Sequence, residues 1–271
     1  MPALPPTPTS HLGSRHAGLP CQCEVCRQWG DARICATCTA RFAQPVPRCQ
    51  RCGLRLGAAA GVCGSCLLDP PVVSSTLCAV DYAFPWDALV VAFKFLAQPE
   101  LASPLARCLA DAVRASQALL PQALLPVPLA PPRLAQRGYN QAWELARRLG
   151  RELQLPAWHD VLSRPVDTAH QAGLNRAARQ RNLRAAFLVE PSQRTRLQGR
   201  HVALVDDVMT TGATLHEAAA ELLRAGALRV DAWVLARTPG PLATAPVTGA
   251  APKAGTDMGA SAGTQTGAAP S

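Results

Sequence analysis

Apolar residues recur along the middle of the chain with two periods, one typical of buried strands and one typical of amphipathic helices. Short apolar runs predict strands centred near Leu124, Val161, Val202 and Val230. Helical spacing predicts helices over 86–95, 101–120 and 215–223, and a further strand is expected over 77–84. Because strands that alternate with helices typically build a parallel sheet, we expect an α/β fold. The four strands would share one sheet with helices on both faces and ligands at its carboxyl edge.

The stretch from His201 to Leu215 is the most informative part of this pattern, because a strand-like run ends there in two adjacent carboxylates, Asp206 and Asp207. A turn of small, mostly hydroxylated residues follows, namely Thr210, Thr211, Gly212, Ala213 and Thr214. Amides at a helix start bind anions, and a glycine lets the backbone approach a ligand, so this loop is interpreted as a phosphate site. The carboxylates suit vicinal hydroxyls or, through water, a hard cation. Together they describe a site for phosphorylated ribose; the alternative is an ordinary strand, turn and helix with a solvated aspartate pair.

Nine of the eleven cysteines lie between Cys21 and Cys66. Eight of them form four Cys-x-x-Cys pairs, namely Cys23 and Cys26, Cys35 and Cys38, Cys49 and Cys52, and Cys63 and Cys66. Each pair can give two thiolates to one metal ion, so two closed four-cysteine zinc sites are predicted. Since the segment has little apolar material to bury, the metal would supply most of its folding free energy.

The arrangement of these cysteines stays open at this point. Sequential pairing, in which the first Cys-x-x-Cys pair joins the second and the third joins the fourth, is preferred over an interleaved pattern. A disulfide framework and an iron–sulfur cluster are the alternatives to zinc, although nothing indicates an oxidising compartment. Cys21 is one thiol too many, and Cys78 and Cys108 are interpreted as buried apolar residues.

Two arginine-bearing segments lie between the strands predicted near Leu124 and Val202. The first places Arg137, Asn140 and Gln141 at a predicted helix start, which suits a pyrophosphate. The second, over 164–184, carries five arginines, beginning with Arg164, and almost no apolar anchor. We expect it to be a mobile flap that closes over an anion.

In chain order these blocks resemble the ComF family of competence and phosphoribosyltransferase-like proteins. The resemblance rests on the Cys-x-x-Cys pairs and on four further blocks, namely Pro126-Val127-Pro128-Leu129, Arg137-Gly138-Tyr139-Asn140-Gln141, Arg164 with Thr168, Gln171, Leu174, Arg181 and Asn182, and Asp206-Asp207-Val208-Met209-Thr210-Thr211-Gly212-Ala213-Thr214. The last motif resembles the phosphoribosyl pyrophosphate signature of type I phosphoribosyltransferases. The resemblance spans roughly Cys23 to Thr238, and Tyr139 stands where a phenylalanine is expected.

This resemblance implies a type I phosphoribosyltransferase-like domain over 71–239, preceded by a double zinc ribbon over 21–70. Phosphoribosyl pyrophosphate would bind with Mg²⁺, its 5-phosphate on the loop from Thr210 to Thr214 and its ribose hydroxyls on Asp206 and Asp207. A nitrogen nucleophile would displace pyrophosphate at the anomeric carbon. The predicted catalytic residues are Asp206, Asp207, Arg137 and Arg164, the arginines stabilising the departing pyrophosphate.

The composition of the chain also indicates which partners it binds and where in the cell it is expected. The formal net charge is +9, which favours polyphosphates or nucleic acid as partners. Because the first 20 residues lack a secretory core segment and no apolar run approaches the ~20 residues of a membrane span, a cytoplasmic protein is expected. The compositions of 1–20 and 240–271 predict disorder.

A second function fits the same residues. The chain could be a non-catalytic competence factor whose zinc ribbons and arginines bind single-stranded DNA, with the ribosyl-phosphate pocket regulatory or vestigial. The resemblance supports DNA uptake, or the use of DNA as a nutrient, as the setting, with competence-machinery proteins as partners. The cysteine-rich segment is positively charged, yet only Trp29 and Phe42 offer rings on which bases could stack.

Overall fold

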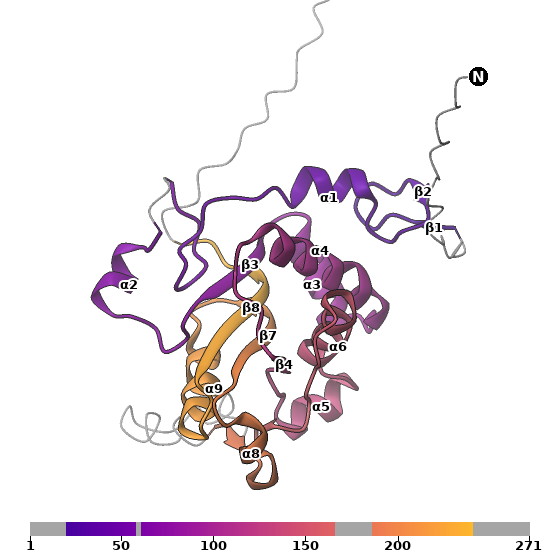
Figure 1. The fold of residues 1–271 in the computed structure, drawn as a ribbon. Coiled ribbons are helices and arrows are strands. Elements are labelled where there is room, and N and C mark those ends of the chain that lie inside the picture. The colour runs from indigo at the N-terminus through magenta and orange to yellow at the C-terminus, as the bar shows by residue number, and fades with distance from the viewer. Residues whose placement is uncertain (1–19, 58–60, 166–185, 241–271) are drawn as a thin grey trace, which may run out of the picture.

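A parallel sheet forms the centre of the computed structural model, which describes residues 20–57, 61–165 and 186–240 (Figure 1). Its four strands lie in the order β3 (Thr76–Asp81), β8 (Arg229–Arg237), β7 (His201–Met209) and β4 (Ala123–Pro126). All neighbouring strands are parallel, and Ala203 of β7 lies between Leu124 of β4 and Asp231 of β8. The carboxyl ends of the strands therefore meet at one edge, as the sequence predicts.

One strand of the sheet differs from the prediction. The run near Val161 does not join the parallel sheet, because β5 (Leu162–Ser163) pairs antiparallel with β6 (Leu188–Val189) in a separate two-stranded sheet. Only two buried apolar residues precede Arg164 and Pro165 there, too few to cross a sheet, and a proline cannot donate to a ladder. The edge position beside β8 belongs to β3, which comes from the strand expected over 77–84.

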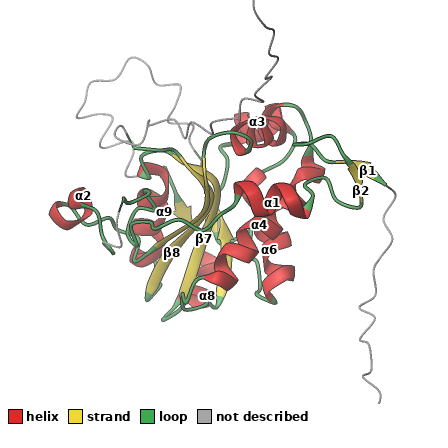
Figure 2. Cartoon of the chain, turned by 90° about the horizontal axis from the view of Figure 1, so that it is seen from above, coloured by secondary structure: helices red, strands yellow, loops and turns green. Residues whose placement is uncertain are grey.

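Helices cover both faces of the sheet (Figure 2). One face carries α3 (Trp86–Phe95), α4 (Ala102–Ala115) and α6 (Gln141–Leu153). The short helix η1 (Pro99–Leu101) joins α3 to α4, and α5 (Pro131–Arg137) lies between β4 and α6. The other face carries α9 (Ala213–Arg224), with η3 (Pro191–Gln193) and α8 (Arg194–Leu197) preceding β7. The helix predicted over 101–120 ends at Ala115.

The central strands supply side chains to two separate cores. On β7, Val202 and Leu204 belong to the core shared with α9, whereas Ala203 and Val205 belong to the core shared with α3, α4 and α6. All four side chains are fully buried. Burial on both faces explains why this strand is a continuous apolar run rather than an alternating one. Each fully buried valine or leucine side chain contributes roughly 1.5–3 kcal/mol relative to an exposed one.

The cysteine-rich segment folds as two small units that pack against different faces of the sheet. The first ribbon, 21–42, contains β1 (Cys21–Gln22), β2 (Trp29–Gly30) and α1 (Ala36–Phe42), and it lies against α3 and α4 (Figure 1). The second ribbon, 48–68, contains α2 (Gly64–Leu68) and packs into the α9 core beside the start of β3. Both units therefore share cores with the sheet domain.

Of the expected flap over 164–184, residues 166–184 lie outside the described residues, as do 1–19 and 241–271 of the two ends for which disorder is expected. Within the described parts of the chain, no helix is long and apolar enough to cross a membrane.

Candidate functional site

The loop predicted to bind phosphate connects β7 to α9 at the carboxyl edge of the sheet. Gly212 lies just before the first residue of α9 with φ +86°, in the left-handed region that favours glycine, and a Cβ there would overlap Met209. Thr210, Thr211 and Ala213 are exposed, and the Thr211 hydroxyl accepts a hydrogen bond from the Ala213 amide at 3.4 Å. The loop thus presents hydroxyls and helix-start amides at the surface, as an anion site requires.

The two predicted aspartates lie directly before this loop, near the end of β7. Asp206 Oδ1 accepts a hydrogen bond from the Asp207 amide at 2.9 Å. Burial, together with the neighbouring charge of Asp207, raises the pKa of Asp206 to about 7, although Lys94 acts in the opposite direction. Two adjacent carboxylates, of which Asp206 has a raised pKa, therefore stand at the entrance to the phosphate loop.

Lys94 is a site residue that the sequence did not reveal. Its Nζ lies 2.7 Å from Asp207 Oδ1, so the last turn of α3 supplies a cation to the aspartate pair. The Asp207 side chain is only 6% exposed, which makes this a largely buried ion pair. A usable signal was present, because the sequence has only two lysines and this one stands between Phe93 and Phe95 in an apolar helix.

The segment around Arg137 is a junction between two helices rather than one helix start. Helix α5 ends at Arg137, and Gly138 has φ +80°. Asn140 caps α6 by accepting hydrogen bonds from the amides of Ala142 and Trp143, and it also donates to the Val127 carbonyl. Its amide is therefore engaged, which corrects the expectation that it faces a pyrophosphate.

Arg137 nevertheless lies beside an unsatisfied buried group. Its guanidinium donates to Gln141 Oε1 at 2.8 Å and stacks over the Phe95 ring, 5.0 Å from the centroid. Gln141 is 1% exposed, and its Nε2 has no hydrogen-bond partner within the described residues. Because a buried amide donor without a partner is costly, a bound acceptor would complete this corner of the sheet edge.

Arg164 lies beside Phe187 and near α9. Its guanidinium is 5.1 Å from the centroid of the Phe187 ring. Its charge lowers the pKa of Glu217, a first-half residue of α9, whereas burial raises that pKa and prevails. The structure thus places Arg137 beside α3 and α6, and Arg164 beside α9.

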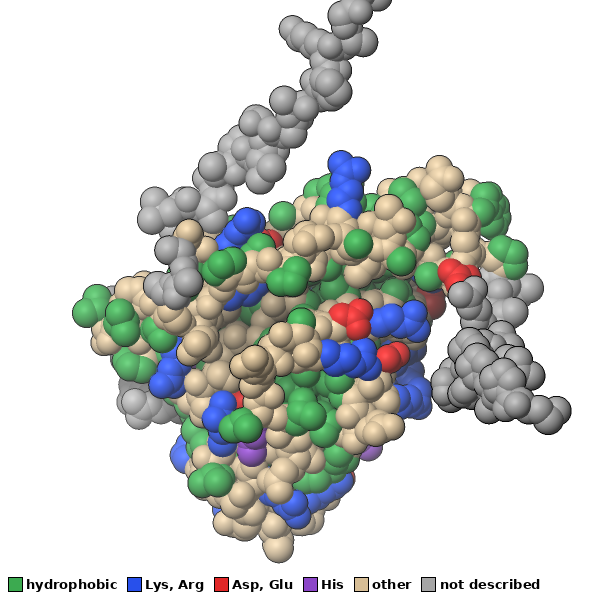
Figure 3. Space-filling view, turned by 45° about the horizontal axis from the view of Figure 1, so that its top comes forward, with side chains coloured by type: hydrophobic (Ala, Val, Ile, Leu, Met, Phe, Trp, Pro, Cys, Tyr) green, Lys and Arg blue, Asp and Glu red, His purple; other side chains and the backbone are tan. Residues whose placement is uncertain are grey.

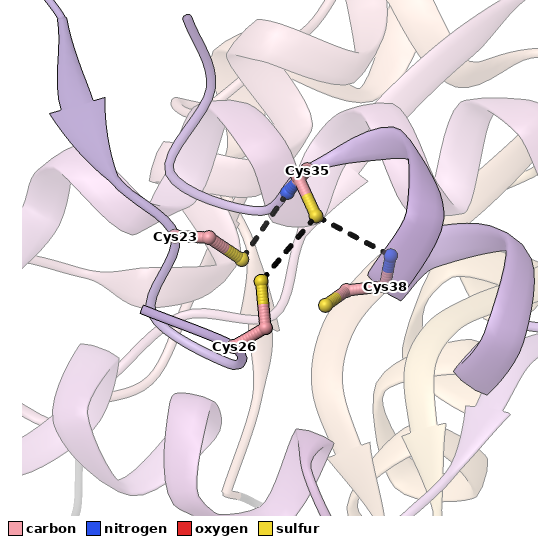
Figure 4. A group of neighbouring side chains, drawn as sticks. All are labelled: Cys23, Cys26, Cys35 and Cys38. Atoms are coloured by element: carbon pink, nitrogen blue, oxygen red, sulfur yellow. Dashed lines mark hydrogen bonds between the residues drawn. The ribbon is translucent and has the colours of Figure 1, made fainter. Parts of the chain in front are cut away.

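The first cluster of cysteines brings together Cys23, Cys26, Cys35 and Cys38, whose sulfurs all lie within 4.8 Å of one another (Figure 4). The amides of Cys35 and Cys38 donate to Cys23 Sγ and Cys35 Sγ, each at 3.4 Å. Burial raises the pKa of Cys23, but amide donors from Cys26, Cys35 and Val25 outweigh it and bring that pKa to about 6. A thiolate so stabilised is a good metal ligand.

The second cluster repeats this arrangement with Cys49, Cys52, Cys63 and Cys66. The Cys63 amide donates to Cys49 Sγ at 3.3 Å, and backbone donors outweigh burial to lower the pKa of Cys49 to about 7. Both clusters follow the sequential pairing, and each can hold one metal ion. None of the eleven cysteines forms a disulfide, and Cys21 belongs to neither cluster.

Comparisons with known proteins agree with this architecture. A curated relative from Salmonella typhi, "DNA utilization protein YhgH", is 37% identical over 81% of this chain and 98% of its own length. "Competence protein F" of Haemophilus influenzae is 38% identical over 75% of this chain and 90% of its own length. This chain belongs to the ComF family. Residues 134–244 also match the family described as "Phosphoribosyl transferase domain".

Solved structures that match this ComF-family chain are more remote. The Bacillus subtilis glutamine phosphoribosylpyrophosphate amidotransferase, complexed with ADP and GMP, is 16% identical over 53% of this chain and 30% of that chain, with a TM-score of 0.38. The family match and the geometry together show a type I phosphoribosyltransferase-like sheet preceded by two four-cysteine ribbons.

Proposed function

We propose that this ComF-family protein binds phosphoribosyl pyrophosphate with Mg²⁺ in the cytoplasm and transfers the phosphoribosyl group to a nitrogen acceptor. The observation that carries the proposal is the adjacent pair of Asp206 and the buried Asp207, near the end of β7 and shortly before the Gly212 loop, with Asp207 held by Lys94. Carboxylates beside helix-start amides match a ribose whose 2- and 3-hydroxyls and 5-phosphate must be held together.

The phosphate would bind the loop from Thr210 to Thr214, because the exposed hydroxyls of Thr210 and Thr211 and the amides at the start of α9 can donate to it. The ribose hydroxyls would donate to Asp206 and Asp207, which fixes the anomeric carbon in position for attack. In a reaction of this kind, positioning and charge stabilisation lower the barrier, so a nucleophilic side chain is not required.

The departing pyrophosphate would be held from two directions. Arg137 and the unsatisfied Gln141 Nε2 lie at the start of α6, and Arg164 lies beside α9. Arginine guanidinium groups bind phosphate oxygens in bidentate fashion, and developing negative charge strengthens these contacts. Residues of the expected flap would add further donors.

The aspartate pair also fits a magnesium ion, because carboxylate oxygens are the ligands that this hard cation prefers. Bound Mg²⁺ would neutralise pyrophosphate charge as the bond to the anomeric carbon breaks. Asp206 and Asp207 are the residues that would hold it, directly or through water.

Zinc is the metal proposed for the two cysteine clusters. Four sulfurs within 4.8 Å of one another, with backbone amides donating to them, match closed tetrahedral sites. These sites leave no position for a substrate, so their zinc would be structural.

A second candidate function is the binding of single-stranded DNA. The names of the relatives, a DNA utilization protein and a competence protein, favour a biological setting in which DNA is handled. The ribbons offer little for it. Their arginines are engaged within the protein, for example Arg33 with Glu24 and Glu100, and Arg48 with Asp81. Figure 3 shows basic side chains scattered over one face among hydrophobic and uncharged groups, rather than gathered in a stripe. We therefore rank the transferase first.

Calorimetric titration of the zinc-loaded protein with phosphoribosyl pyrophosphate and Mg²⁺ tests the proposal. We expect micromolar binding, and pyrophosphate release when one of a panel of nucleobases is added. The double variant Asp206→Asn/Asp207→Asn should abolish binding with unchanged zinc content. The exposed Asp111→Asn of α4, which pairs only with Arg114 in the described residues, serves as the matched control. Binding that survives in the double variant would refute the site, and absence of binding by the parent protein would favour the DNA function.

A further inference from the structure

Arg237 connects the second ribbon to the phosphate loop. It is the last residue of β8 and is only 6% exposed. Its Nε donates to the Cys52 carbonyl at 2.9 Å, and its Nη1 donates to the carbonyls of Met209 at 3.1 Å, Thr238 at 2.9 Å and Thr210. All of these acceptors are backbone carbonyls, and within the described residues no carboxylate pairs with Arg237. A buried cation of this kind is retained only where hydrogen bonds satisfy it.

The carbonyls come from two parts of the chain that are distant in sequence. Cys52 is one of the four residues of the second cysteine cluster. Met209 and Thr210 are the end of β7 and the first residue of the proposed phosphate loop. A single planar side chain therefore fixes the distance between a metal-binding turn and the loop, because its donors diverge at fixed angles.

The second ribbon is itself seated firmly on the sheet. The Thr76 amide and hydroxyl donate to the carbonyls of Gln50 and Arg51 at 2.8 and 2.7 Å. Arg48 forms an ion pair with Asp81 at 2.6 Å. Gly53 has φ +69° and lies so close that a Cβ there would overlap Cys78 Sγ of β3. The turn that carries Cys52 thus lies directly on β3 and against the carboxyl end of β8.

The first ribbon makes no comparable connection within the described residues. It is attached to the α3 side through the Trp86 indole, which donates to the Phe42 carbonyl at 2.9 Å, and through Arg33, which pairs with Glu100. The two metal sites therefore differ in what they touch, although their cysteine spacing is alike. This difference makes the first site an internal control for the second.

We propose that Arg237 is a positioning residue for the phosphate loop, and that metal in the second cysteine cluster holds the loop in place through it. The proposal rests on the proposed function for the loop's ligand, but the coupling itself involves only this chain's residues and the metal. Metal at the second cluster holds the turn that carries Cys52 in place. Arg237, bonded to the Cys52 carbonyl, in turn holds the carbonyls of Met209 and Thr210. The loop amides are therefore already oriented toward the phosphate before it binds. The second ribbon is in this sense part of the site.

Hydrogen exchange at 209–214, measured by mass spectrometry on the full zinc-loaded chain, tests the coupling without any ligand. We expect Arg237→Met to raise exchange in this loop at least several-fold while zinc content stays at about two ions per chain. Cys49→Ser/Cys63→Ser, which removes the second site, should raise it likewise. Cys35→Ser/Cys38→Ser, which removes the first site, should leave it unchanged.

Affinity for phosphoribosyl pyrophosphate gives the second measurement. Arg237→Met should weaken binding about tenfold or more, and Arg237→Lys, which keeps one charged donor, should restore part of it. Unchanged exchange in a folded Arg237→Met protein would overturn the proposal. If Arg237→Met does not fold, Arg237→Lys and the second-site variant Cys49→Ser/Cys63→Ser replace it. Unchanged exchange at 209–214 in both of these proteins would also overturn the proposal. A parent protein that does not bind the ligand would refute the proposed function, while the exchange data would still decide the coupling.

Discussion

Lys94 Nζ lies 2.7 Å from Asp207 Oδ1, and this pair joins the last turn of α3 to the aspartates at the end of β7. The contact links elements that are more than 100 positions apart in sequence and covers Asp207 almost completely. Without it, the buried Asp207 would lie next to the carboxylate of Asp206 with no ion-pair partner among the described residues. Lys94 therefore makes the predicted ribose site compatible with a stable fold.

Lys94→Met should lower the free energy of unfolding by about 3–5 kcal/mol, because it leaves Asp207 buried without its counter-charge. Urea unfolding monitored by circular dichroism measures this. Adding Asp207→Asn should recover most of the loss, since the uncompensated charge is then absent. The exposed Arg151→Met of α6 is the matched control and should change stability by less than about 0.5 kcal/mol. If the losses of unfolding free energy from Lys94→Met and Asp207→Asn were additive in the double variant, the two residues would not interact as proposed.

The raised pKa of Asp206 predicts how stability depends on pH. The pKa is 3.8 in the unfolded chain and about 7 in the folded one, so between these values the folded chain holds more protons at this carboxyl. The free energy of unfolding should therefore fall as pH rises from about 4 to 7. Asp206→Asn stays neutral and should remove this contribution, at most roughly 4 kcal/mol over the window. Denaturation curves at several pH values measure it, and identical slopes for variant and parent would contradict the assignment.

Local patterns in the sequence predicted the parts that depend on local chemistry. The run from Val202 through Asp207 to Gly212 contains its own strand, turn and helix start, and the spacing of the cysteines selects their partners. Both therefore appear where the sequence places them. The prediction that the strand near Val161 joins the parallel sheet was wrong, because an apolar run does not indicate which sheet a strand belongs to.

Contacts between distant segments were not visible in the sequence. The sequence marks Lys94 only as one of two lysines, placed between two phenylalanines of an apolar helix, and it is the fold that brings Lys94 to Asp207. Arg237 likewise ends a strand in the sequence, while its carbonyl partners come from Cys52 and Thr210. The partners of such residues depend on the tertiary structure, and the periodicity of apolar residues in the sequence does not predict them.

Loss of the second cysteine cluster should cost one metal ion and much of the local structure. Cys49→Ser/Cys63→Ser should reduce bound zinc from about two to about one ion per chain, because two thiolates cannot close the tetrahedral site. Metal analysis of the purified protein measures this, and Cys21→Ser is the matched control, since Cys21 lies outside both clusters. Two ions in the double variant would show that the cluster does not bind zinc.

The reactivity of the remaining thiols should distinguish metal-bound, buried and free cysteines. Burial raises the pKa of both Cys78 and Cys108 to about 12, so almost no thiolate is present at neutral pH, and both side chains are inaccessible. In the zinc-loaded protein, iodoacetamide should therefore modify Cys21 alone among the eleven cysteines within minutes. After chelation of zinc, the eight cluster cysteines should also react, while Cys78 and Cys108 stay protected until the sheet unfolds. Mass spectrometry of digested protein measures this order, and early modification of Cys78 would contradict the close packing of the second ribbon on β3.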